Sequence, residues 1–90
     1  MNRRAALQSA LDAEVNRWSA LSVDDLASNL SKLCTYQIEK NGSICQFEVE
    51  ILQNQPAFLH VDVRVDDGRL PYSIRPLGRS FIKKKGQFPS

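Results

Sequence analysis

Ninety residues, of which 42% are hydrophobic and 24% charged, are enough for one small globular domain and exclude a disordered or collagen-like chain. No uncharged apolar run approaches the roughly 18 residues of a membrane-spanning helix. The net charge of +2 is unevenly distributed. Residues 1–68 hold six basic and all ten acidic residues, whereas residues 69–90 hold six basic residues and no acidic one.

The first expected element is an amphipathic helix over residues 3–20, capped at its N-terminus by Asn2. Its large apolar residues recur every three or four positions, which places them on one face. That face contains Leu7, Leu11, Val15 and Trp18. Acidic residues interrupt the short apolar run too early for a secretion signal.

A second, shorter helix is expected over residues 23–31. Ser22 is a suitable N-cap, because its hydroxyl can accept a hydrogen bond from the backbone N–H of Asp25. Apolar residues then recur at helical spacing as far as Leu30. Together the two helices predict a helical layer over residues 1–31.

The hydrophobic period changes to two at Cys34, which is typical of half-buried strands. Asn41-Gly42 interrupts the alternation and predicts a hairpin, because a type I′ turn needs a positive φ at both of its central positions. A two-residue turn pairs residues whose numbers sum to 83, so that Ile38 lies opposite Cys45. The turn and the alternation agree on this register.

A third strand is expected from Leu59 to Val65, antiparallel to the second. Its register with the second strand is open, because pairs whose numbers sum to 110 or to 112 both fit the alternation. Either register places Asp62 opposite a glutamate of the second strand, and like charges directly opposite one another are unfavourable.

The next region contains Pro71 and Pro76, each of which lacks a backbone N–H. A regular interior strand over residues 70–77 is therefore excluded, and we expect a loop or an irregular edge there. Whether a fourth strand follows is open. The candidate is residues 78–83, with Phe81 facing inward.

These elements predict a single α+β domain over residues 1–90, with two layers. Helices in residues 1–31 pack on one face of an antiparallel meander of three or four strands in residues 33–83. Residues 84–90 are expected to be a frayed basic terminus. The expected core consists of Leu7, Leu11, Val15, Trp18, Leu26, Leu30, Tyr36, Ile38, Phe47, Val49, Ile51, Leu59, Val61, Val63 and Phe81.

No catalytic, metal-binding or cofactor-binding motif is present in the sequence. The four glycines form no phosphate-binding loop, and Cys34 and Cys45 have neither redox nor zinc-site spacing. His60, the only histidine, is predicted on the opposite sheet face from both cysteines, so a catalytic Cys–His pair is not expected. We therefore expect a protein that is not an enzyme, with reduced cysteines and a cytoplasmic location.

The outward positions of the predicted sheet carry mostly charged residues. A pair of facing carboxylates can hold a hard cation or raise one carboxyl pKa for acid–base chemistry. The sequence implies no pocket around them, so we interpret these residues as a water-facing surface. They are Glu39, Glu48, Glu50, His60, Asp62 and Arg64.

Two interaction surfaces remain as hypotheses. Apolar residues out of phase with the core predict contact with a protein partner or with a second copy of the chain. These residues are Ile44, Leu52, Phe58 and Ile82. The alternative is weak nucleic-acid binding through phosphate contacts of the basic C-terminal segment, whereas no membrane contact is expected. The candidate phosphate-binding residues are Arg69, Arg75, Arg79, Lys83, Lys84 and Lys85.

Overall fold

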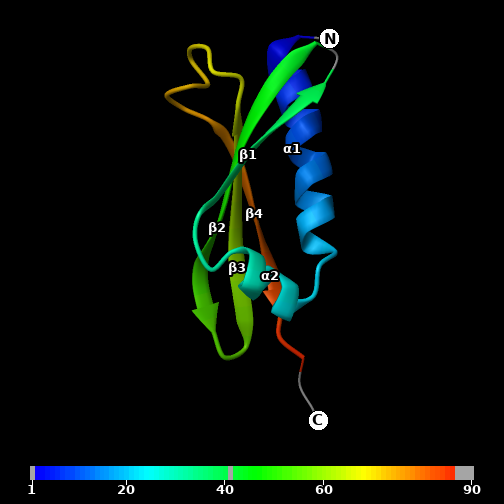
Figure 1. The fold of residues 1–90 in the computed structure, drawn as a ribbon, viewed down its shortest axis with the longest axis vertical. Coiled ribbons are helices and arrows are strands. Elements are labelled where there is room, and N and C mark those ends of the chain that lie inside the picture. The colour runs from blue at the N-terminus through cyan, green and yellow to red at the C-terminus, as the bar shows by residue number, and fades with distance from the viewer. Residues whose placement is uncertain (1, 41, 87–90) are drawn as a thin grey trace.

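The computed structural model describes residues 2–40 and 42–86 and shows a two-layer α+β fold (Figure 1). The predicted architecture, an N-terminal helical layer on an antiparallel meander sheet, is confirmed. Within these residues no helix is both long enough and apolar enough to cross a membrane. The elements are helices α1 (Arg3–Ser19) and α2 (Val23–Asn29) and strands β1 (Cys34–Lys40), β2 (Ser43–Gln55), β3 (Phe58–Asp66) and β4 (Leu77–Lys84).

Both helices begin at the predicted caps. The Asn2 side chain accepts a hydrogen bond from the backbone N–H of Ala5 at 2.7 Å, and the Ser22 hydroxyl accepts one from Asp25 at 3.1 Å. These bonds satisfy N–H groups that have no partner within the first helical turn. α2 ends at Asn29, two residues earlier than expected, yet the Leu30 side chain that follows is still buried.

The four strands follow one another in the sheet in chain order, β1-β2-β3-β4. The predicted register of β1 and β2 is confirmed, with Ile38 opposite Cys45. As far as Ile51, each residue of β2 lies opposite the residue of β3 for which the two numbers sum to 112. Leu52 then forms a bulge that shifts the pairing by one residue. β2 continues beyond this bulge to Gln55.

The fourth strand is present, and Phe81 lies opposite Val61 on the face toward the helices. Two residues of the expected frayed terminus are held in place, because Lys84 ends β4 and the Lys85 backbone N–H donates to the Ala57 carbonyl at 2.9 Å. Residues 87–90 lie outside the described residues.

A loop connects β3 to β4 where the prolines exclude a regular strand. The Arg75 N–H donates to the Pro71 carbonyl at 2.9 Å, which folds the loop into a turn. The Arg3 guanidinium of α1 holds the start of the loop by two hydrogen bonds to the Asp67 carboxylate, of 2.5 and 2.9 Å. The hydrogen bond from Arg3 lowers the pKa of Asp67 to about 2.

The core lies between the helices and one sheet face, hereafter the inner face. α1 packs mainly against β3 and β4, so Val61 and Val63 are completely buried, whereas Tyr36 and Ile38 of β1 are only half-buried. Ile51 and Phe81, also expected in the core, are half-buried as well. Four residues outside the expected core are also buried, namely Ala10, Glu14, Cys45 and Val65.

Cys34 and Cys45 are not joined by a disulfide, as predicted. Cys45 lies opposite Ile38, so four positions of β1 separate it from Cys34. At the rise of a β-strand this is roughly 13 Å, well beyond the roughly 7 Å that a disulfide allows between Cα atoms.

Trp18 closes the helical layer onto the sheet, and its loss is expected to destabilise the fold. Its side chain is 5% exposed, and its indole N–H donates to the Tyr36 hydroxyl at 2.7 Å. Trp18→Ala should lower the free energy of unfolding by about 3–5 kcal/mol through the cavity it leaves. Trp18→Phe keeps most of the volume, so it should lose only about 1–2 kcal/mol with the hydrogen bond.

Urea denaturation, monitored by circular dichroism, measures both changes in the free energy of unfolding. Equal losses for the two variants would contradict a packing role of the indole ring.

Candidate functional site

Three of the four apolar residues predicted for a partner surface come together on the outer sheet face, which is turned away from the helices. His60 of β3 lies opposite Ile82 of β4. On the other side of His60, the bulge sets both Leu52 and Gln53 of β2 against it. Phe58 is two residues from His60 along β3 and therefore shares its face. We call Leu52, Phe58, His60 and Ile82 the outer-face patch.

The patch is accessible. Leu52 is 48% exposed and Ile82 is 53% exposed, while Phe58 and His60 are half-buried between them. Phe58 lies opposite Lys84, which puts it diagonally next to Ile82, at roughly 7–8 Å between Cα atoms. Apolar side chains from three adjacent strands thus surround His60 on one exposed face.

Ile44, the fourth predicted residue, does not belong to this patch. It lies at the opposite end of β2, where it faces Glu39 of β1. Eight positions separate it from Leu52, or about 26 Å of strand. Ile44 is therefore a single exposed residue, although its exposed fraction of 50% is close to those of Leu52 and Ile82.

Three further exposed apolar residues were not predicted from the sequence. Leu33, just before β1, is 48% exposed, and Leu70 and Ile74 are 64% and 74% exposed in the loop between β3 and β4. The alternation that separates inner from outer residues exists only within strands, so no pattern in the sequence predicts the exposure of these three residues.

The carboxylates on the outer face surround Arg64 of β3. Its guanidinium donates to Glu48 at 3.3 Å, to Glu50 at 3.2 Å and to Asp62 at 2.5 Å. Partial burial acts to lower the pKa of Arg64, but hydrogen bonds to the three carboxylates outweigh it and raise that pKa. Asp62 faces a glutamate, as predicted for either register; the glutamate is Glu50, and Arg64 offsets their repulsion.

This arrangement accounts for the acidic face as a salt-bridge network on a water-facing surface. Among the described residues, no group of three or more His, Cys, Asp or Glu side chains is placed to hold a metal ion. His60 and the two cysteines lie on opposite faces of the sheet, as predicted.

The basic residues of the C-terminal segment do not form one patch. Arg79 pairs with Asp12 of α1 at 3.0 Å, and the Lys83 ammonium donates to the Ser19 carbonyl at 3.0 Å. The others are dispersed. Arg69 and Arg75 lie in the loop between β3 and β4, Lys84 is on the outer face beside Phe58, and Lys85 donates to the Asn54 side chain at 2.6 Å.

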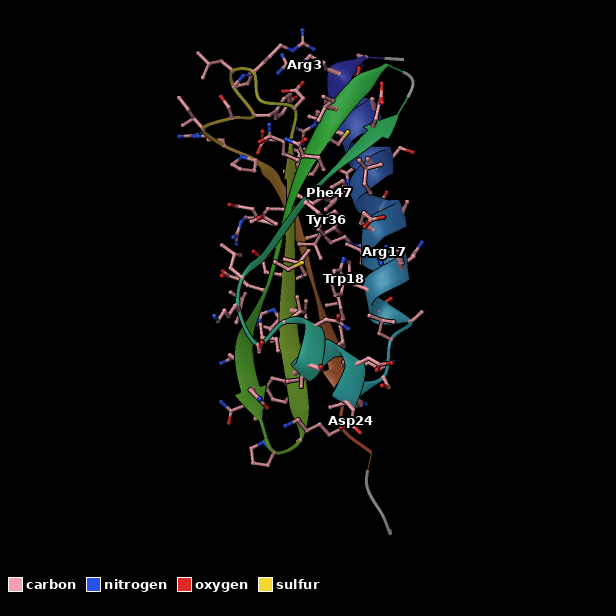
Figure 2. All side chains as sticks on the ribbon, viewed as in Figure 1. Arg3, Arg17, Trp18, Asp24, Tyr36 and Phe47 are labelled. Carbon is pink, nitrogen blue, oxygen red and sulfur yellow. The ribbon has the colours of Figure 1, made fainter. Side chains whose placement is uncertain are left out.

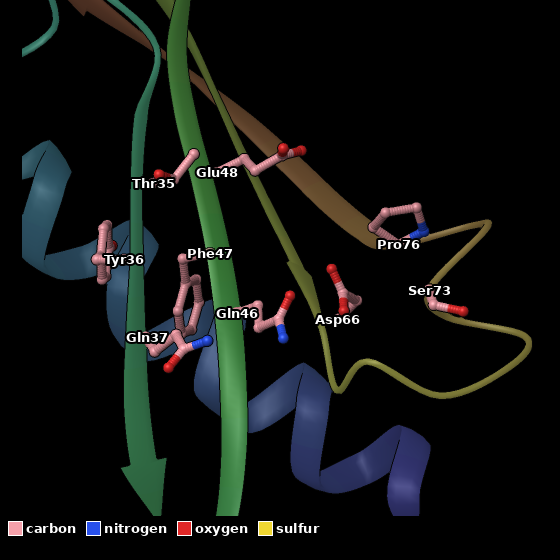
Figure 3. A pocket seen from close by; sticks show the side chains of 9 residues that line it. All are labelled: Thr35, Tyr36, Gln37, Gln46, Phe47, Glu48, Asp66, Ser73 and Pro76. Carbon is pink, nitrogen blue, oxygen red and sulfur yellow. The ribbon is translucent and has the colours of Figure 1, made fainter.

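An open groove of about 460 Å³ lies on the outer face between β1, β2 and the loop that precedes β4 (Figure 3). Ser73 and Pro76 of the loop lie on the side of the groove opposite β1. Asp66, on its wall, accepts a hydrogen bond from the Gly68 N–H at 2.7 Å. The other residues lining the groove are Thr35, Tyr36, Gln37, Gln46, Phe47 and Glu48. Its amides, hydroxyls and carboxylates include no nucleophile paired with a base.

A buried carboxylate links α1 to β1. Glu14 is 7% exposed and accepts hydrogen bonds from Arg17 at 2.8 and 3.1 Å and from the Tyr36 hydroxyl at 2.6 Å. Figure 2 shows Arg17 and Trp18 on α1 beside Tyr36 and Phe47 of the sheet. The Tyr36 ring stacks on Phe47 with centroids 5.3 Å apart. Each side chain of this network thus has a hydrogen-bond partner, which a buried polar group needs.

Burial acts to raise the pKa of the Glu14 carboxyl, but the hydrogen bonds from Arg17 and Tyr36 outweigh it and hold that pKa below its usual range. Burial and the hydrogen bond to Glu14 raise the pKa of the Tyr36 hydroxyl to about 12. The network therefore keeps Glu14 charged and Tyr36 protonated. Its hydrogen bonds with Tyr36 run between α1 and β1, so they position the helix on the sheet.

Comparison with protein-family models, with curated proteins and with solved structures finds no significant match for this chain.

The raised pKa of Tyr36 predicts a loss of stability in alkali. The unfolded chain releases this proton near pH 10, whereas the folded protein retains it to about pH 12. The stabilisation is therefore complete below pH 10 and is lost as the pH rises toward 12. Urea unfolding at a series of pH values between 9 and 12 measures this effect. The free energy of unfolding should fall more steeply with pH for the wild type than for Tyr36→Phe.

Tyr72→Phe is the matched control, because Tyr72 is the only other tyrosine. The free energy of unfolding of Tyr72→Phe should fall with pH as steeply as that of the wild type. Parallel curves for the wild type and Tyr36→Phe would show that Tyr36 ionises alike in both states.

Proposed function

We propose that this protein is a non-enzymatic protein-interaction module that contacts its partner through the outer-face patch. The observation that carries the proposal is that Leu52, Phe58 and Ile82, from three strands, gather around His60 on a sheet face that the helices leave uncovered. Exposed apolar areas that are continuous across several elements are characteristic of partner-binding surfaces.

The surroundings of the patch suit a protein partner. Lys84 lies opposite Phe58, and Glu50 and Asp62 lie next along the strands, so charges of both signs border the apolar centre. A polar rim around an apolar centre is typical of protein interfaces. An enzymatic role has less support, because the carboxylates of this face form salt bridges with Arg64.

Nucleic-acid binding has less support than protein binding. Phosphate contacts need basic side chains along one surface, whereas here Lys83 and Lys84 point to opposite faces of β4 and Arg79 is paired with Asp12. The two unbridged cysteines support a reducing compartment, and we propose the cytoplasm as the location.

The outer-face patch can be tested with charge substitutions of matched exposure. Leu52→Glu and Ile82→Glu place a carboxylate in the patch, whereas Ile44→Glu places one on the same face about 26 Å away. In affinity capture from native lysate quantified by mass spectrometry, the wild type and Ile44→Glu should enrich the same protein. Both patch variants should reduce that enrichment by about tenfold or more, because a charge is desolvated on binding.

Circular dichroism should show all three variants folded, since each replaces an exposed side chain. Equal enrichment by all four proteins, or its loss in Ile44→Glu alone, would contradict the assignment of the patch.

The nucleic-acid alternative is tested by the salt dependence of binding to a generic single-stranded oligonucleotide. We expect no measurable binding at physiological salt, because the basic residues are dispersed. Tight binding that weakens steeply with salt and disappears when Lys83, Lys84 and Lys85 are all replaced by Gln would instead favour nucleic-acid recognition.

A further inference from the structure

β1 is an unprotected edge of the sheet. It pairs with β2 on one side, and within residues 2–40 and 42–86 no strand pairs with its other side. Figure 3, seen from the outer face, shows β1 as the border strand with α1 passing behind the sheet. The free backbone groups of such an edge are a template for pairing with another strand.

The two edges of the sheet differ in their protection. β4 carries Arg79, Lys83 and Lys84, and charged residues of one sign discourage pairing of an edge strand with its own copy. β1 contains no proline, glycine or bulge, and its only charged residues are Glu39 and Lys40 at its end. Pairing between two copies is therefore more favourable at β1 than at β4.

The register identifies which backbone groups of β1 are free. Two residues join Lys40 to Ser43, and a hairpin of this kind closes on a hydrogen-bonded pair. Hydrogen-bonded and non-hydrogen-bonded pairs then alternate along an antiparallel ladder. Thr35, Gln37 and Glu39 are consequently the residues whose N–H and C=O groups point away from β2.

These three residues are symmetric about Gln37. Two copies of β1 that run antiparallel with Gln37 on the two-fold axis place Thr35 of each opposite Glu39 of the other. Every outward N–H and C=O group then meets a complementary group of the second copy. No like charges face each other, because the glutamate lies opposite a threonine.

The inner-face side chains fit the same register. Tyr36 of one copy lies opposite Ile38 of the other, and both are half-buried in the single chain because α1 packs over β3 and β4 instead. A largely apolar cleft of about 160 Å³ lies beside them, lined by Ala10, Ala13, Glu14, Ile38, Cys45 and Phe47. Pairing would cover apolar surface that the helical layer leaves partly open.

We propose that the protein forms a symmetric dimer by antiparallel pairing of β1 with β1 of a second copy, with Gln37 on the two-fold axis. The product is one continuous sheet with four strands from each copy. The proposal goes beyond the function proposed above, because it uses the β1 edge and leaves the outer-face patch free. An edge of seven residues buries a small area, so the dimer dissociates on dilution.

A charge at Gln37 tests the two-fold register. Gln37→Lys puts two ammonium groups opposite each other at the axis, and Gln37→Glu does the same with two carboxylates. Gln46→Lys is the matched control, because Gln46 is the exposed β2 neighbour of Gln37 on the same face and does not lie at the edge. Sedimentation velocity over a series of protein concentrations measures the dimer dissociation constant.

The wild type and Gln46→Lys should dimerise with similar dissociation constants. Gln37→Lys and Gln37→Glu should each weaken dimerisation by about tenfold or more. An equal mixture of these two variants should restore a dimer, because opposite charges then meet at the axis. Restoration requires that position 37 faces itself, which a general effect on folding would not produce.

A wild type that remains monomeric at all concentrations would overturn the proposal. So would a dimer that Gln37→Lys leaves intact, or one that the mixture of charge variants does not restore. Dimerisation should be unaffected by Ile82→Glu, and capture of a partner by the outer-face patch should be unaffected by Gln37→Lys. Failure of one proposal is therefore distinguishable from failure of the other.

Discussion

The fold depends on one layer of helix covering one face of a four-stranded sheet. α1 and α2 bury the inner face of β3 completely, as the zero exposure of Val61 and Val63 shows. None of the described helices covers the outer face. That face is therefore exposed to water and needs polar side chains. On this face, Arg64 forms salt bridges with the neighbouring carboxylates and so offsets their mutual repulsion. The surfaces open to a partner are therefore those that the helical layer cannot reach.

Within that layer, the position of α1 is fixed by polar contacts as well as by packing. Apolar surfaces alone allow a helix to slide or rotate on a sheet, whereas the Glu14 carboxylate must keep its hydrogen bonds to Tyr36 and Arg17. At the other end of the same helix, Arg3 is bound to Asp67 of the loop. Two such anchors define one orientation of α1, and this orientation leaves β1 half-covered.

Most of the fold was predictable because independent signals coincided. The Asn41-Gly42 spacing and the alternation around it required the same pairing of Ile38 with Cys45, and the structure has that pairing. The candidate patch was predictable only in part. The apolar residues were identified as out of phase, but the bulge that brings Leu52 beside His60 depends on contacts between strands. Successive side chains of a strand point to opposite faces, so a strand at β4 already implied that Lys83 and Lys84 lie on different faces of the sheet.

The bulge also has a consequence for how this surface can change. Leu52 is an extra residue between two stretches of regular pairing, one ending at Ile51 and the other beginning at Gln53. A chain lacking this single residue would have an unbroken ladder from one end of β2 to the other, with every remaining pair preserved. One codon can therefore be gained or lost without shifting either strand, so the composition of the patch can vary while the core stays the same.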